Sequence, residues 1–220
     1  MKWYRLAGAM LCVALLGACA SKGPVTATHD PYARQKWQAR LDRLAPVEAW
    51  DIKGRLAVRT EEDGGSATLL WQRMGLDHEI ELYGPFGGGR VSIVQDASGA
   101  VMRDNKKNVF EDTSAAALLY RRVGWHVPFD SLKYWLKGVP EPGEVNALIL
   151  DSAGLALGFQ QRGWDIAILD YAEQGGFVLP RKLFIRALPG TVHLVDEKGR
   201  DLGDKLEVKV VLKRWLVEDL

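Results

Sequence analysis

The residues that come nearest to a known chemical motif form a glycine-rich stretch, Gly84-Pro-Phe-Gly-Gly-Gly89. Its glycine spacing is that of a phosphate-binding loop, in which backbone N–H groups hold the phosphates. Such loops continue with Lys and then Ser or Thr, whereas this chain continues with Arg90-Val91 and is predicted to enter a strand instead of a helix. The stretch is therefore not expected to bind a nucleotide.

The histidines and acidic pairs give no local support for metal or triad chemistry. No two histidines are spaced i, i+4, and none follows the pattern of a nucleophile elbow. The acidic pairs lie next to glycines or at a helix start, where turn and capping roles are simpler, although a catalytic role stays open. The residues concerned are His29, His78, His126, His193, Glu61-Glu62 and Glu111-Asp112.

The composition is that of a folded domain, and its charge does not favour binding to nucleic acid. Hydrophobic residues make up 47% and charged residues 26% of 220 residues, which is enough for a core. Lys and Arg number 29 against 28 Asp and Glu, whereas phosphate contacts demand concentrated positive charge. The eight Trp residues suggest large rings placed around an apolar region or at a membrane interface.

The N-terminus has the pattern of a lipoprotein signal peptide. Lys2 and Arg5 precede an apolar run over 6–18, which is too short to span a bilayer and ends in Gly17-Ala18-Cys19. Small residues directly before a cysteine resemble the bacterial lipobox, in which the cysteine is acylated and becomes the first residue. We therefore expect a signal peptide over 1–18, a lipidated flexible tether over 19–29 and one domain over 30–220.

This interpretation also accounts for both cysteines. Cys12 lies in the discarded segment and Cys19 carries the lipid, so the mature chain is expected to contain no free thiol and no disulfide. Ala20 and Ser21 follow the acylated cysteine in place of the Asp that retains lipoproteins in the inner membrane of enteric-type bacteria. The outer membrane, on its periplasmic face, is the expected location.

The remaining chain predicts a mostly β domain with a few helices. Asp30-Pro31 and apolar residues at helical spacing predict a helix over 30–45, and capping residues predict two more over 114–123 and 131–137. Alternating residues separated by glycine-rich turns predict about ten strands, enough for a strongly curved antiparallel sheet or barrel. Besides the runs between 50 and 93, the predicted strands cover 147–150, 155–161, 164–171, 181–188, 191–196 and 205–215.

A series of short motifs, in this order, resembles the LolB family of outer-membrane lipoprotein-insertion proteins. Each motif is weak alone, but the series runs from the lipobox to the last predicted strand. The motifs are Trp50-Asp-Ile-Lys-Gly54-Arg55-Leu-Ala-Val, Leu70-Trp71-Gln72, Leu82-Tyr-Gly-Pro85-Phe86-Gly87, Ser131-Leu-Lys-Tyr-Trp135-Leu-Lys-Gly138-Val-Pro140, Gly163-Trp164, Tyr171, Leu179-Pro180 and Trp215.

The resemblance implies both a fold and a function. The fold would be an incomplete, strongly curved antiparallel β-barrel closed by helices around an apolar cavity. The protein would accept acylated lipoproteins from the periplasmic carrier LolA and insert them into the outer membrane, without a cofactor, a metal or a catalytic step. We expect it to work as a monomer.

Two groups of candidate site residues follow. Alternating apolar residues could line the cavity, although plain core packing explains any one of them as well. Phe86 stands in a turn where polar residues are usual, and in the family the equivalent loop presents a hydrophobic residue to the membrane; the match covers Pro85, Phe86 and Gly87. The cavity candidates are Leu56, Val58, Leu70, Leu82, Trp135, Trp164, Ile166, Ile168 and Phe184.

Two other classes of function stay open at this point. A lipoprotein of this composition could scaffold an envelope complex without transporting lipid, or it could hydrolyse lipid. Three observations separate these functions. Transfer of acylated cargo would support lipoprotein insertion, a stable partner would support a scaffold, and released fatty acid would support a hydrolase.

Overall fold

The computed structural model describes residues 31–84, 89–123, 128–195 and 199–217. Signal peptide, tether and the residues 85–87 lie outside the described residues. The elements in chain order are α1 (Pro31–Leu44), β1 (Ala49–Arg59), β2 (Gly64–Met74), β3 (Asp77–Tyr83), β4 (Arg90–Asp96), β5 (Gly99–Arg103), β6 (Val109–Asp112), α2 (Ala115–Val123), α3 (Phe129–Trp135), β7 (Asn146–Leu150), β8 (Ala156–Gln161), β9 (Trp164–Gln174), β10 (Phe177–Ala187), β11 (Leu194–Val195), β12 (Asp201–Gly203) and β13 (Glu207–Val217).

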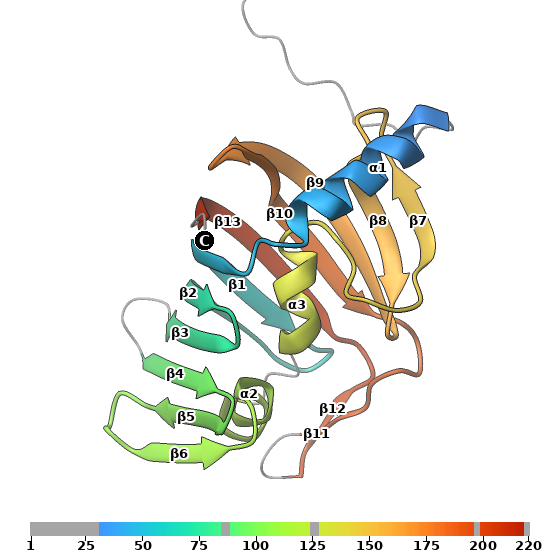
Figure 1. Cartoon of the computed structure of the whole chain (residues 1–220). Helices are drawn as coiled ribbons and strands as arrows, with labels where there is room; N and C mark the ends of the chain where they lie inside the picture. Colours follow the sequence, from blue (N-terminus) through green and yellow to red (C-terminus); the bar gives the residue numbers. More distant parts are fainter. Residues whose placement is uncertain (1–30, 85–88, 124–127, 196–198, 218–220) are drawn as a thin grey trace, which may run out of the picture.

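The described strands form one large antiparallel sheet and a small hairpin. The large sheet has 11 strands in the order β6-β5-β4-β3-β2-β1-β13-β10-β9-β8-β7, and β11 pairs with β12. The first and last strands of the chain, β1 and β13, are therefore neighbours in the centre of the sheet. Because β6 and β7 lie at opposite edges, the sheet curves but does not close into a barrel (Figure 1). The predicted mostly β, antiparallel, incompletely closed architecture is confirmed to this extent.

The inner face of the sheet is apolar because the strands alternate with period two. Rows of buried side chains cross it from strand to strand, and removing them from water is the main source of stability. One row joins β9, β10, β13 and β1 through Ile168, Leu183, Val210 and Leu56. The side chains between these, on the same strands, lie on the outer face.

Gly54 allows the two central strands to approach each other. A Cβ at this position would lie 2.5 Å from the carbonyl oxygen of Val211, which no side chain can tolerate without a backbone shift. The pairing of β1 with β13 also shifts between Lys53 and Gly54, as at a β-bulge. Both features increase the local bend of the sheet.

The helices lie on the inner side of the curved sheet (Figure 1). The predicted helix over 30–45 is confirmed as α1, and α2 covers the predicted segment 114–123 almost entirely. The third helix begins two residues earlier than predicted, because Pro128 is its N-cap and its carbonyl accepts the first helical bond from Leu132 N–H. Asp130, which precedes the predicted helix, lies in the first turn of α3, where its charge favours the helix.

Two strand predictions were incomplete. The strands β5 and β6 were not predicted, since they are short and lie beside polar turns. Of the predicted strand over 191–196, the described residues contain only Leu194–Val195 as strand, which pairs with β12 and not with the large sheet.

Candidate functional site

The structure places six of the cavity candidates on the inner face of the sheet and a seventh, Trp135, on α3, which packs against that face. Seven of the nine are buried in one apolar cluster that also includes residues of all three helices. The register aligns Leu56 with Ile168, and Val58 with Ile166, across the two strands between them. The seven are Leu56, Val58, Leu82, Trp135, Trp164, Ile166 and Ile168.

The other two candidates, Leu70 and Phe184, lie on the outer face. Leu69 and Trp71 are buried on the inner side of β2, so Leu70 between them must point the other way. Phe184 has the same relation to Leu183 and Ile185 on β10. Leu70 and Phe184 are half-buried and do not belong to the inner wall.

Helix α3 occupies the concave side of the sheet through aromatic contacts. Its first residue, Phe129, packs on Trp71 with ring centroids 4.1 Å apart, and its last, Trp135, lies 6.4 Å from Trp164. Trp50 packs edge-on against both Trp71 and Trp215. A group of tryptophans around α3 therefore joins strands from both halves of the sheet, which the dispersed positions in the sequence did not indicate.

Gln161 holds α3 and the following segment to β8. Its Oε1 accepts hydrogen bonds from Trp135 Nε1 (3.1 Å) and from the Glu141 backbone N–H (3.0 Å). Its Nε2 donates to the carbonyl oxygens of Glu141 (2.9 Å) and Glu144 (3.3 Å). Gln161 is buried, so all of its polar groups are satisfied by protein.

A hollow of about 550 Å³ lies between α1 and the segment that follows α3. This volume is within the range of small-ligand sites, about 300 to 1,000 Å³. Its apolar wall comes from Trp37, Leu41, Leu44, Ala45, Tyr134, Val139, Pro140, Pro142, Val145 and Leu148. None of the nine cavity candidates is part of this wall.

Part of the wall of this hollow was visible in the sequence, but only as the apolar side of a predicted helix. Trp37, Leu41 and Leu44 recur at helical spacing, which predicted the helix without showing what its apolar side faces. Val145 lies outside the predicted elements and Leu148 lies in the strand predicted over 147–150, and only the tertiary structure brings them opposite α1. On its other flank α1 borders a second hollow of about 360 Å³, whose wall includes Leu155 and Phe177.

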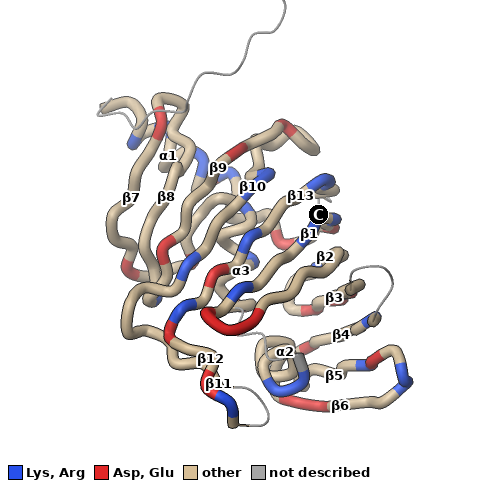
Figure 2. The backbone as a smooth tube through the Cα atoms, turned by 180° about the vertical axis from the view of Figure 1, so that it is seen from behind, with Lys and Arg blue, Asp and Glu red and all other residues tan. Residues whose placement is uncertain are grey.

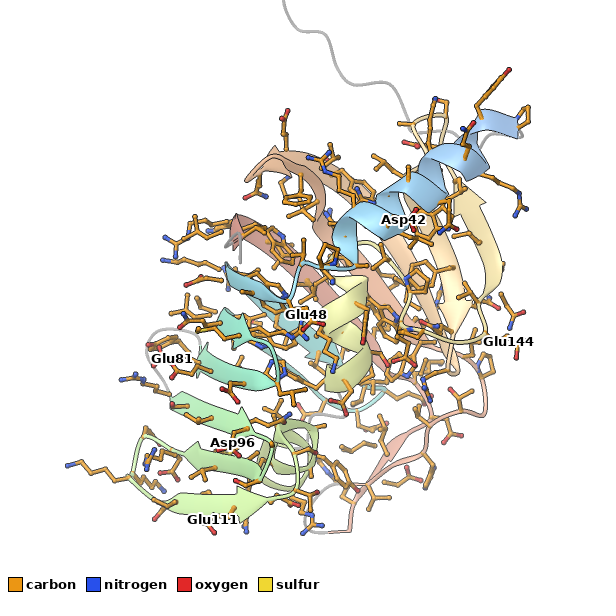
Figure 3. The ribbon with its side chains drawn as sticks, in the orientation of Figure 1. Asp42, Glu48, Glu81, Asp96, Glu111 and Glu144 are labelled. Atoms are coloured by element: carbon orange, nitrogen blue, oxygen red, sulfur yellow. The ribbon has the colours of Figure 1, made fainter. Side chains whose placement is uncertain are left out.

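Buried cations fix the end of α1 beside the larger hollow. Lys137 Nζ donates to the carbonyl oxygens of Leu44 (3.2 Å) and Val47 (3.0 Å), where a helix C-terminus has unpaired acceptors. Arg40 of α1 donates in return to the Lys137 carbonyl (2.9 Å). Burial lowers the pKa of Lys137 to about 8, with a further contribution from nearby Arg73. Glu48, at 4.0 Å from Arg73, lies at the rim of the hollow (Figure 3).

His78 is a buried neutral base beneath α3. Its Nδ1 accepts a hydrogen bond from Trp71 Nε1 at 3.1 Å. Burial, together with the positive charges of Arg73 and Lys133, lowers the pKa of His78 to about 4. The imidazole therefore supports the Trp71 ring that holds α3.

The loop between β3 and β4 has a well-defined base. Gly84 N–H donates to the Gly89 carbonyl at 2.8 Å, which closes the loop. Glu81 accepts hydrogen bonds from Tyr83 and Arg90, and these contacts lower the pKa of its carboxyl group. The expected membrane-contact residues 85–87 and the expected lipid anchor Cys19 lie outside the described residues.

The candidate site in the described residues is built from apolar surfaces. Within 31–217, apart from the three undescribed gaps, no group of three or more His, Cys, Asp or Glu is arranged to hold a metal ion. In the same part of the chain, no helix is long and apolar enough to cross a membrane. The arrangement consists of an apolar sheet face, short helices packed on it and an apolar hollow at their margin.

Comparison with known proteins gives a consistent result. The family described as outer membrane lipoprotein LolB matches residues 48–215. The chain is 36% identical over 216 residues to the outer-membrane lipoprotein LolB of Nitrosococcus oceani, covering 98% of each chain. It is 33% identical over 193 residues to that of Pseudomonas putida strain GB-1, covering 87% of this chain and 94% of the relative.

A solved structure of a DUF1329 family protein from Desulfovibrio piger aligns with a TM-score of 0.49 and 6% identity, covering 84% of this chain and 93% of that one. This likeness carries no argument about function. The family match covers most of the chain, and the relatives agree with it along nearly their whole length. The chain belongs to the outer membrane lipoprotein LolB family.

Proposed function

We propose that the protein is an outer-membrane lipoprotein that accepts acylated lipoproteins from the periplasmic carrier LolA and inserts them into the outer membrane. It would be cleaved after residue 18, anchored through Cys19 on the periplasmic face and joined by a tether over 19–29 to the domain. Family membership supports this proposal. No covalent step is part of it.

The observation that carries the proposal is the apolar hollow between α1 and the segment 137–148. Each acyl chain of a lipoprotein avoids water with about 0.8 kcal/mol per methylene, on the order of 10 kcal/mol per chain, so a protein that receives it must offer an apolar surface. The hollow of about 550 Å³ offers such a surface, and its wall shares Trp37, Leu44 and Val139 with the buried cluster.

We propose that the six candidates on the inner face of the sheet become part of the same site when α3, which carries Trp135, moves away from the sheet. The helix has seven residues, well below the roughly 12 to 15 that an isolated helix needs, so its stability depends on its contacts. Those contacts include the ring of Phe129 on Trp71 and the hydrogen bond from Trp135 to Gln161. Displacing α3 would expose the wall that includes Leu56 and Ile168.

We further propose that the loop residues Pro85, Phe86 and Gly87 contact the membrane during insertion. The support is the closed base of the loop, where Gly84 N–H donates to the Gly89 carbonyl. An aromatic ring on a loop tip gains free energy when it enters the membrane interface.

A photo-crosslinking amino acid placed at Leu41 or Leu148, both on the hollow wall, tests the proposal. The matched control is Leu169, which points outward from β9 and is 52% exposed. We expect an acylated cargo peptide, delivered by the carrier, to crosslink at the two hollow positions and not at Leu169. An unacylated peptide should not crosslink at any of them.

The same experiment separates the alternatives. Equal crosslinking of the acylated and unacylated peptides at the hollow positions would overturn the proposal and favour a scaffold. Release of free fatty acid during the incubation would favour a hydrolase.

A further inference from the structure

The outer face of the central strands carries a strong positive charge. The strands β1, β13 and β10 contain nine Lys and Arg residues but only two acidic residues, Asp51 and Glu207. All nine basic side chains are exposed: Lys53, Arg55, Arg59, Arg181, Lys182, Arg186, Lys209, Lys213 and Arg214. Since the chain has 29 basic and 28 acidic residues in total, all other residues together carry 20 against 26. We call these nine residues the basic face.

Most of this charge is not neutralised by neighbouring carboxylates. Only three of the nine make ion pairs with described residues: Arg181 with Asp170, Arg186 with Asp165 and Arg214 with Asp51. The six others, Lys53, Arg55, Arg59, Lys182, Lys209 and Lys213, make none within the described part of the chain. Figure 2, seen from the side opposite α1 and α3, shows basic residues along β1, β13 and β10.

Folding does not account for this arrangement. Lys53 and Arg214 are direct cross-strand partners, and like charges in that position destabilise a sheet. Lysines often protect the edges of sheets from aggregation, but these three strands lie in the centre of the sheet. Solubility requires only charges of mixed sign. A face that keeps like charges together at some cost to stability is typical of a binding surface.

The apolar residues among the cations favour a lipid surface as the partner. Phe184 is half-buried at the middle of the face, and the charged groups of Arg186 and Lys209 lie 5.8 and 5.9 Å from its ring centre. Basic side chains with apolar stems beside an aromatic ring suit the boundary between headgroups and acyl chains.

The basic face is also continuous with the loop proposed to touch the membrane. A cross-strand row runs from Lys182 through Val211, Arg55 and Thr68 to Tyr83 and on to Arg90. Tyr83 and Arg90 form the base of the β3–β4 loop. The row therefore leads from the basic face to the base of this loop, where Arg90 pairs with Glu81.

We propose that the basic face binds the anionic phospholipid headgroups of the membrane surface and orients the protein there. This inference rests on the proposed function, because it takes the membrane as the place of work. The protein would hold its convex side against the headgroups and leave α1 and the apolar hollow open to a carrier in the periplasm.

The test is binding to lipid vesicles by the chain that carries Cys19→Ala and a cleavable secretory signal in place of residues 1–18, so that neither an acyl anchor nor the apolar segment 6–18 contributes. Vesicles of phosphatidylcholine alone are compared with vesicles that also contain phosphatidylglycerol, at low and high salt. The test variant is Lys53→Gln, Arg55→Gln, Lys209→Gln. The control variant removes three exposed basic residues elsewhere, Arg34→Gln, Lys106→Gln, Lys107→Gln.

We expect binding that requires phosphatidylglycerol and is lost at high salt, because exposed charges are screened there. A basic residue near an anionic surface contributes about fivefold to binding, so the test variant should bind on the order of 100-fold more weakly at low salt. The control variant should bind nearly as the parent does. Circular dichroism should show that both variants are folded, since all six positions are exposed.

Three results would overturn the inference: equal binding to both vesicle types, unchanged binding by the test variant, or an equal loss in the control variant. Loss of binding to the carrier, with vesicle binding intact, would instead assign the basic face to an acidic protein. Crosslinking of acylated peptide at Leu148 is measured on the same samples. If the test variant crosslinks normally but no longer binds vesicles, the basic face acts in membrane binding and not in cargo binding. If the parent binds vesicles but does not crosslink the acylated peptide, the proposed function is contradicted and the inference about the basic face is not.

Discussion

Replacing Gln161 with Leu should release the segment that closes the concave side of the sheet. Gln161 is the residue of β8 that bonds to both Trp135 at the end of α3 and the backbone of Glu141 and Glu144. Leu has a similar volume but neither donor nor acceptor, so the change removes the hydrogen bonds without opening a large cavity.

The expected cost follows from the groups left without partners. Trp135 Nε1, Glu141 N–H and the Glu141 carbonyl would each lose a bond to Gln161 in a buried environment. At about 1 to 2 kcal/mol for each unsatisfied group, the three together destabilise the fold by about 3 to 6 kcal/mol. Burial of the added apolar surface of Leu offsets about 1 to 2 kcal/mol. We therefore expect the free energy of unfolding to fall by about 2 to 4 kcal/mol.

Urea unfolding followed by circular dichroism measures this difference. The matched control is Gln160→Leu, on the same strand but facing the other side, which should change the free energy of unfolding by about 0.5 kcal/mol or less. A loss below about 1 kcal/mol for Gln161→Leu would refute the reasoning, because the buried bonds would then contribute little. An equal loss in both variants would refute it as well, since the effect would belong to the strand and not to the bonds.

Three further predictions concern pH, packing and delivery. Because burial lowers the pKa of His78 to about 4, the unfolded chain binds more protons than the folded chain between pH 6.5 and 4, and the free energy of unfolding falls as the pH falls. We expect this loss to be about 1 to 2 kcal/mol after solvent screening and to be absent in His78→Gln. Equal acid sensitivity of the parent and His78→Gln in thermal melts would contradict this. Gly54→Ala should cost about 1 to 3 kcal/mol in urea unfolding, because its Cβ would meet the Val211 carbonyl, and an unchanged midpoint would argue against that close approach. Phe86→Glu should melt within about 0.5 kcal/mol of the parent and accept cargo, yet fail to deliver it to liposomes, because a carboxylate resists entry into the interface; normal delivery by the folded variant would remove the membrane-contact role of Phe86.

The sequence by itself determined the secondary structure that depends on local pattern. The signals that define α1 are local: a proline at its first residue and apolar residues at helical spacing after it. The helix could therefore be predicted within one residue at each end. Period-two alternation likewise identified most strands of the large sheet. The series of short motifs was enough for the family, since their order is itself a property of the sequence.

The faces of the strands depended on more than the sequence. Leu69, Leu70 and Trp71 are consecutive apolar residues, and nothing in such a run says which of them points inward. The pairing of β2 with β1 and β3 decides it, and it places Leu70 on the outer face. Phe184 was misplaced for the same reason.

The tertiary structure alone decided which residues meet. Gln161 and Trp135 are 26 positions apart and Lys137 and Leu44 are 93 apart, and no local period relates such pairs. The basic face is a case of the same kind, because Lys53, Lys182 and Lys209 come from three distant segments that become neighbours only when β13 pairs with both β1 and β10. The sequence shows a chain that is nearly neutral in total, whereas the pairing of its strands brings basic residues together on the outer face of the sheet.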